Sequence, residues 1–168
     1  PAVQAWRDLI PQVPRRSTLT AWVGTAGAWS FLPPDLHHRP VASVGLVWVG
    51  NPDDGRRQLA ALRAAMPAAA ERIQELSYLE LQTMDDDREG HHRRRYWKGH
   101  YLRALEDAAI DAFLTRGVPA DTDPALLPAA SLQAYGGAIA EVGVDDTAFD
   151  HRNALVEFVA SAVWTDPA

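Results

Sequence analysis

The segment 153–164 places one carboxylate among apolar residues in the periodicity of a β-strand. Glu157 shares a strand face with Val159, Ser161 and Val163, while the alternate positions are apolar. Burying a carboxylate without a partner is unfavourable. Glu157 therefore either faces water on one side of an antiparallel sheet or acts as a base toward a bound substrate. The residues alone leave both interpretations open.

The segment 130–142 predicts a neighbouring strand with polar side chains on one face. Ser131, Gln133 and Tyr135 alternate along it, and Gly136-Gly137 follows. Polar groups followed by two residues without side chains suit a flat ligand that lies close to the backbone. A β-bulge or a sheet edge explains the two glycines equally well. These residues are candidates for lining a ligand site.

Other groups of reactive side chains lack the spacing that their chemistry requires. The glycines at 24–27 and 136–137 match neither a dinucleotide-binding fingerprint nor a P-loop. The basic, aromatic segment 91–98 could stack on bases, but an acidic run before it cancels much of its field, so we expect no nucleic-acid partner. We also expect no metal, because no closed zinc pattern is formed by the remaining candidates: His37-His38, His91-His92, His100 and Asp85–Asp87.

The bulk composition is that of a soluble globular protein. The 168 residues suit one domain over 1–168, with 47% hydrophobic and 23% charged residues. The chain has no cysteine, which excludes disulfides, a cysteine nucleophile and thiolate metal sites. No stretch approaches the ~18 apolar residues of a membrane span, and no signal peptide opens the chain. We expect a cytoplasmic bacterial protein without a membrane partner, and export stays open.

The apolar periodicity predicts an α+β fold. Strands are expected over 18–26, 41–49, 130–142 and 153–164, with a weak one near 73–76. Helices are expected over 1–10, over 51–66 with Asn51 as cap, over 78–84 and, as the clearest, over 99–116. The segment 85–95 is expected to be a solvated loop. Consecutive strands at both ends favour an antiparallel sheet with the helices packed on one face.

Several motifs follow one another in an order typical of a flavoprotein family. They are Tyr96-Trp97-Lys98-Gly99, then Gln133-Ala134-Tyr135-Gly136-Gly137-Ala138, then Phe149-Asp150-His151-Arg152 with Trp164 thirteen residues beyond the histidine. Together they resemble the berberine-bridge-enzyme-like branch of the FAD-linked oxidases, the vanillyl-alcohol-oxidase and p-cresol-methylhydroxylase superfamily. The chain departs from the family pattern at Asp150, where proline is usual, and at Gly99, where serine is usual.

This resemblance implies the substrate domain of an FAD-dependent oxidoreductase, a fragment expected to be inactive alone. Hydride would pass from an alcohol, sugar or similar small molecule to FAD, which an FAD-binding domain of the same or a partner chain would hold. The resemblance makes Glu157 the catalytic candidate and Gln133, Tyr135 and Ser161 the substrate-binding candidates. A sheet face left exposed in the fragment could drive homodimerisation. The alternative is a stand-alone small-molecule-binding or interaction domain without catalysis.

Overall fold

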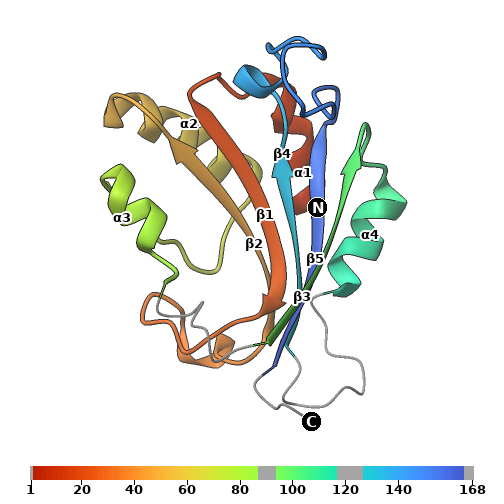
Figure 1. The fold of residues 1–168 in the computed structure, drawn as a ribbon. Coiled ribbons are helices and arrows are strands. Elements are labelled where there is room, and N and C mark those ends of the chain that lie inside the picture. Colours follow the sequence, from red (N-terminus) through yellow and green to blue (C-terminus); the bar gives the residue numbers. More distant parts are fainter. Residues whose placement is uncertain (1, 87–93, 117–126, 165–168) are drawn as a thin grey trace.

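The computed structural model describes residues 2–86, 94–116 and 127–164. Its five strands form one antiparallel sheet in the order β2-β1-β4-β5-β3 (Figure 1). The strands are β1 (Ser17–Thr25), β2 (Pro40–Trp48), β3 (Arg94–Leu102), β4 (Leu127–Ala134) and β5 (Val156–Trp164). The helices are α1 (Ala2–Leu9), α2 (Pro52–Ala65), α3 (Tyr78–Thr83) and α4 (Asp107–Arg116), with 3₁₀ turns η1 (Ile10–Gln12), η2 (Pro34–Leu36) and η3 (Gly137–Ile139). The predicted α+β class is confirmed.

Three of the helices cover one face of the sheet, which we call the core face. Helices α1, α2 and α4 each bury apolar side chains in the same cluster as the alternate residues of β1, β4 and β5. That cluster contains Val3, Trp6, Leu62, Ile110 and Phe113 from the helices, and Leu19, Ala21, Val23, Ala130, Leu132 and Val156 from the strands. Helix α3 buries no residue and lies apart from this layer (Figure 1).

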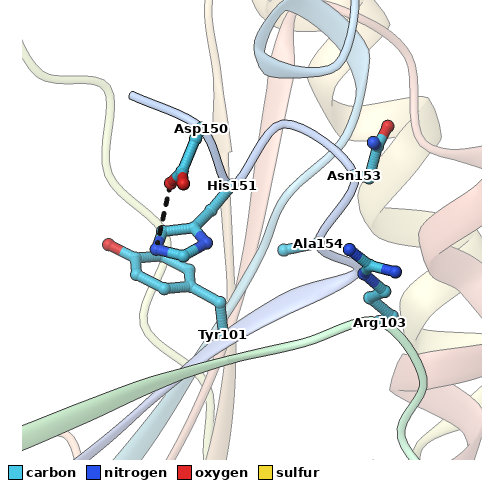
Figure 2. Close-up of a pocket in the computed structure, with 6 residues that line it drawn as sticks. All are labelled: Tyr101, Arg103, Asp150, His151, Asn153 and Ala154. Atoms are coloured by element: carbon cyan, nitrogen blue, oxygen red, sulfur yellow. Dashed lines mark ion pairs between the residues drawn. The ribbon is translucent and has the colours of Figure 1, made fainter. Parts of the chain in front are cut away.

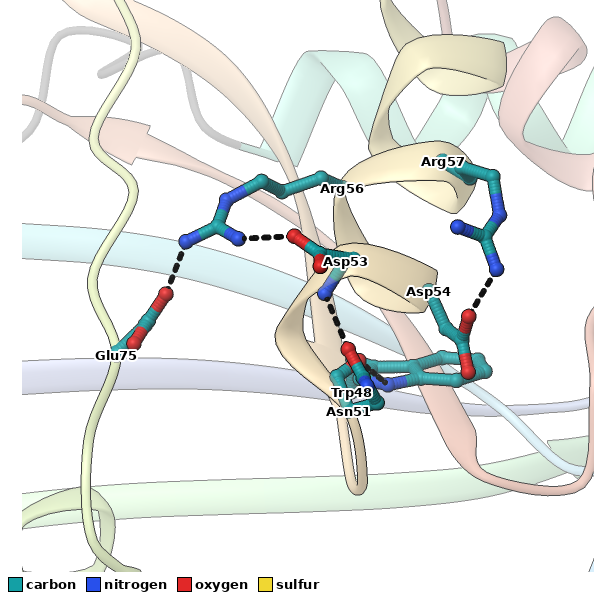
Figure 3. A network of polar contacts seen from close by, with 7 residues as sticks. All are labelled: Trp48, Asn51, Asp53, Asp54, Arg56, Arg57 and Glu75. Carbon is teal, nitrogen blue, oxygen red and sulfur yellow. Dashed lines mark hydrogen bonds and ion pairs between the residues drawn. The ribbon is translucent and has the colours of Figure 1, made fainter.

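Helix α2 begins where the sequence predicts, because its first turn is capped from the preceding residue. The side-chain oxygen of Asn51 accepts a hydrogen bond from the backbone N–H of Asp53 at 2.8 Å, and Pro52 occupies the first turn. Figure 3 shows this cap, together with the exposed ion pairs that Arg56 forms with Asp53 and Glu75. Exposed pairs of this kind stabilise a fold by about 1 kcal/mol at most.

The helix predicted over 99–116 is wrong in its first third. Residues 99–102 complete β3 and pair with β5, and α4 begins only at Asp107. The apolar residues Leu102 and Leu105 both pack against the core, but from a strand and from a connection. Leu102 and Leu105 therefore have the spacing of an amphipathic helix although they belong to a strand and to a connection.

Two smaller predictions also fail. No strand forms near 73–76, where the chain runs without regular structure beside α2 and is tied to it by the ion pair of Arg63 with Glu71. The strand predicted over 130–142 ends at Ala134, since Gly137 adopts φ +48° and starts η3. Of the loop predicted over 85–95, residues 87–93 with His91 and His92 lie outside the described residues, whereas Arg94 and Arg95 belong to β3. No described helix is long and apolar enough to cross a bilayer.

Candidate functional site

The face of the sheet opposite α1, α2 and α4, which we call the open face, carries the predicted site residues. Gln133 of β4 pairs directly with Glu157 of β5, and Tyr101 of β3 pairs with Glu157 from the other side. Thr20 of β1 pairs with Gln133 in turn. Directly paired residues have Cβ atoms about 4.5–5.5 Å apart. The register thus places four polar side chains in one row across four strands.

Ser161 lies on the same face but at some distance from this row. It is four residues beyond Glu157 along β5, or roughly 13 Å at the rise of a strand, and it pairs with Ala129 and Trp97. Its hydroxyl donates to the backbone oxygen of Ala129 at 3.5 Å. Ser161 and Glu157 therefore share a face without sharing an immediate neighbourhood.

Tyr135 holds the Glu157 carboxylate. The pairing of β4 with β5 continues one residue beyond β4, where the N–H of Tyr135 donates to the oxygen of Leu155 at 2.8 Å. The phenol then donates to Oε2 of Glu157 at 3.0 Å. Burial, followed by this hydrogen bond to a carboxylate, raises the pKa of Tyr135 well above its ordinary value. The phenol consequently stays protonated near neutral pH and can donate to Glu157. Among the described residues, no group forms a hydrogen bond with Oε1 of Glu157.

A cluster of four rings closes one end of this site. The Tyr101 ring lies 5.6 Å from both the Tyr135 and the Phe149 ring centroids, and His151 stacks on Tyr101 at 4.1 Å with an interplanar angle of 20°. Figure 2 shows His151 over Tyr101, with Asp150 at 3.3 Å from the imidazole. The Arg152 guanidinium lies over the Phe149 ring at 4.9 Å. These contacts fix Tyr101 beside Glu157.

Two cavities of the described residues lie beside or away from Glu157 and Gln133. The cavity in Figure 2, between Tyr101, Arg103 and His151, has a volume of about 60 Å³, which suits a water or two. A larger cleft of about 520 Å³ is lined by Ser30, Phe31 and residues 71–74. Neither contains Gln133 or Glu157, so a substrate at Glu157 would lie on the open sheet itself. No described group of three or more acidic or histidine side chains could hold a metal ion.

Sequence reasoning missed Tyr101 as a neighbour of Glu157. The error follows from placing residues 99–102 in a helix. On a strand, the alternation of Trp97, Gly99 and Tyr101 puts all three on the open face, opposite Ser161, Val159 and Glu157. The aromatic residues of the Tyr-Trp-Lys-Gly motif, followed by Tyr101, were the signal that would have favoured a strand.

Comparisons with known proteins find similarity in structure but not in sequence. No family model matches the chain, and no curated protein matches it significantly. Among solved structures, an aclacinomycin oxidoreductase has a TM-score of 0.66 at 21% identity, with 99% of this chain and 33% of that chain covered. A glucooligosaccharide oxidase of Acremonium strictum has a TM-score of 0.73 at 18% identity, covering 98% and 35%. The berberine bridge enzyme of Eschscholzia californica has a TM-score of 0.70 at 16% identity, covering 98% and 33%.

The resemblance inferred from the ordered motifs is thus confirmed at the level of the fold. This chain spans about a third of the length of each of these proteins. Nearly all of it aligns, so the shared fold is that of the sheet and its covering helices.

Proposed function

We propose that this chain is the substrate-facing part of an FAD-dependent oxidoreductase that oxidises an alcohol, sugar or similar small molecule. The observation that carries the proposal is the Glu157 carboxylate on an open sheet face, held at Oε2 by the phenol of Tyr135. The fold shared with proteins described as oxidoreductases and oxidases supports it. A carboxylate fixed in this way has the chemistry of a general base.

Among the described residues, the open face fits the planar ring of FAD, whereas the first turn of α2 does not fit its diphosphate. The open face offers a flat surface with Thr20, Ser131 and Gln133, which suits a planar ring. A diphosphate needs several backbone N–H groups and positive charge, whereas the first turn of α2 carries Asp53 and Asp54. We therefore assign the diphosphate to an FAD-binding domain of the same or a partner chain. When bound, FAD would supply the hydride acceptor.

The residues of the open face would handle the proton and the orientation of the substrate. Glu157 would accept the proton of the reacting hydroxyl at Oε1, the oxygen that Tyr135 leaves free. Tyr135 would keep the carboxylate oriented. Gln133, directly opposite Glu157, would hydrogen-bond a second polar group of the substrate, and Ser161 would contact a more distant part. Homodimerisation through the open face remains a prediction.

The replacement Glu157→Gln tests the role of the carboxylate. In the intact enzyme we expect flavin reduction to slow at least tenfold, because a general base contributes about 10²–10⁴-fold to the rate of such a step. Anaerobic stopped-flow spectroscopy of the flavin absorbance measures this step. Glu141→Gln is the matched control, because Glu141 is exposed and pairs only with Arg15. An unchanged rate of flavin reduction in Glu157→Gln would contradict the proposed role.

A further inference from the structure

Gly99 leaves the backbone of β3 bare between two aromatic side chains. Trp97, Gly99 and Tyr101 alternate on the open face, with side-chain exposures of 62% for Trp97 and 36% for Tyr101. Gly99 pairs with Val159, two residues along the strand from the pair of Tyr101 with Glu157. The backbone of Gly99 is itself exposed. The row of side chains on this strand is therefore interrupted directly beside the carboxylate.

Neither backbone conformation nor packing requires a glycine at this position. Gly99 is not among the glycines with positive φ, which are Gly50 and Gly137. A Cβ at Gly99 would lie 3.6 Å from the Phe158 oxygen, 3.8 Å from Val159 Cγ2 and 3.9 Å from Glu157 Oε1, all ordinary contacts. A glycine inside a strand costs about 0.5–1 kcal/mol relative to alanine. The benefit of this glycine must lie in what it leaves uncovered.

What Gly99 leaves uncovered is the free oxygen of Glu157. Tyr135 occupies Oε2, and Oε1 points toward Gly99. A bare strand position often marks a close approach of a ligand to the backbone. His151 stacks on Tyr101 with ring centroids 4.1 Å apart, which fixes the Tyr101 ring as an aromatic surface beside Gly99.

We propose that Gly99 determines substrate specificity by admitting a six-membered ring over its backbone, between Trp97 and Tyr101. A hydroxyl on the ring donates to Oε1 of Glu157, and the ring contacts the flanking aromatic side chains. The ring carries no negative charge, since the Glu157 carboxylate, whose described hydrogen bond comes from the phenol of Tyr135, repels anions. This inference rests on the proposed function, because it takes Glu157 as the group that meets the substrate.

A binding experiment on the 168-residue chain tests this proposal without any flavin. Two hydroxylated rings, methyl β-D-glucoside and 4-hydroxybenzyl alcohol, are titrated while the backbone amides of Gly99 and Val159 are followed by NMR. We expect saturable shifts with at least one of them, and which one binds distinguishes a sugar ring from an aromatic ring. Benzoate is expected to give no shift. Equal shifts with benzoate, or no shift with either hydroxylated ring, would overturn the proposal.

Two substitutions at Gly99 then separate access from folding. Gly99→Val is expected to weaken binding at least tenfold, and Gly99→Ala by a smaller factor, while circular dichroism shows a folded chain. Glu141→Gln is again the control and should bind like the wild type, since Glu141 is exposed and pairs with Arg15 away from the open face. Unchanged affinity in both Gly99 variants overturns this inference alone. Unchanged flavin reduction in Glu157→Gln, with binding at Gly99 intact, contradicts the proposed function alone.

Discussion

The two faces of the sheet use alternate residues of the same strands for opposite purposes. On β4, Leu132 is 1% exposed beneath the helices, whereas the next residue, Gln133, is exposed on the other side. On β1, Leu19 and Ala21 are buried in the core, and Thr20 between them faces the open side. A polar and aromatic face without helical cover contributes little to folding. Its residue types are therefore better explained by a ligand or a neighbouring domain than by stability.

This difference lets stability and function be altered separately. Full burial of a large aliphatic side chain stabilises a fold by about 1.5–3 kcal/mol, while exposed substitutions usually change stability by less than about 0.5 kcal/mol. Of the candidate residues, Gln133 is exposed and Ser161 is half-buried. Variants on the open face should consequently fold.

The largest effect is expected from a substitution on the core face of β4. Leu132→Ala removes a fully buried side chain from the cluster formed with α1 and α4, and we expect a loss of about 3 kcal/mol in the free energy of unfolding. Urea denaturation followed by circular dichroism measures it. The adjacent variant Gln133→Ala is the control and should change stability by less than about 0.5 kcal/mol. Similar losses in both variants would show that the open face also supports the fold.

A smaller effect is expected at Gly24, because the side chain of Trp22 on the same strand already covers the open face at this position. A Cβ at Gly24 would lie 2.3 Å from Cζ2 of Trp22, whose ring lies 6.3 Å from that of Trp29. Gly24→Ala must displace the Trp22 ring, and we expect a loss of about 2 kcal/mol with a change in tryptophan fluorescence. Thermal and urea unfolding measure the loss.

Gly99→Ala is the control for this prediction, because it adds the same methyl group on the same face, on the edge strand β3 instead of the interior strand β1. Its contacts are all 3.6 Å or longer, so stability should stay unchanged or increase slightly. If Gly24→Ala were as stable as Gly99→Ala, the packing of the Trp22 ring would not require a glycine at position 24. The proposed difference, with Gly24 making room for Trp22 and Gly99 leaving the backbone open, would then be wrong.

The sequence predicted those parts of the fold that local patterns determine. Loose alternation identified β1 and an apolar, β-branched run identified β2, each within one residue, and β5 was predicted with a start three residues too early. The Asn-Pro pair located the start of α2. The strand β3 was missed because Leu102 and Leu105 continue into α4 with helical spacing. Only pairing with β5, a contact between residues distant in sequence, decides between the two structures.

The candidate site was predicted in its residue types but not in its contacts. Glu157, Gln133 and Tyr135 were all identified from strand alternation and from the family resemblance. The hydrogen bond between Tyr135 and Glu157 depends on the register of β4 against β5, and the ring contacts of Phe149 depend on a connection without regular structure. Neither kind of contact has a periodic signal in the sequence. The role of Gly99 is likewise visible only from its neighbours in space.

The smallest effect is expected from Tyr135→Phe, which removes the hydroxyl that contacts Glu157 on the open face. Loss of a hydrogen bond to a carboxylate in a partly exposed site should lower the free energy of unfolding by about 1 kcal/mol at pH 7. The folded-state pKa of Tyr135 is raised above its ordinary value of 10.0, so this contribution is fully present below pH 10. Above pH 10 the phenol ionises in the unfolded state first, and stability falls as the pH rises.

The wild type should therefore lose stability between pH 10 and 11 more steeply than Tyr135→Phe, as measured by urea unfolding at each pH. Tyr96→Phe is the matched control, since Tyr96 is 63% exposed and its loss at pH 7 should be below about 0.5 kcal/mol. Identical slopes in the wild type and Tyr135→Phe would mean that the phenol does not donate to Glu157 in solution. Glu157 would then have both oxygens available, and the assignment of Oε1 as the substrate-facing atom would lose its basis, whereas the separation between the core face and the open face would stand.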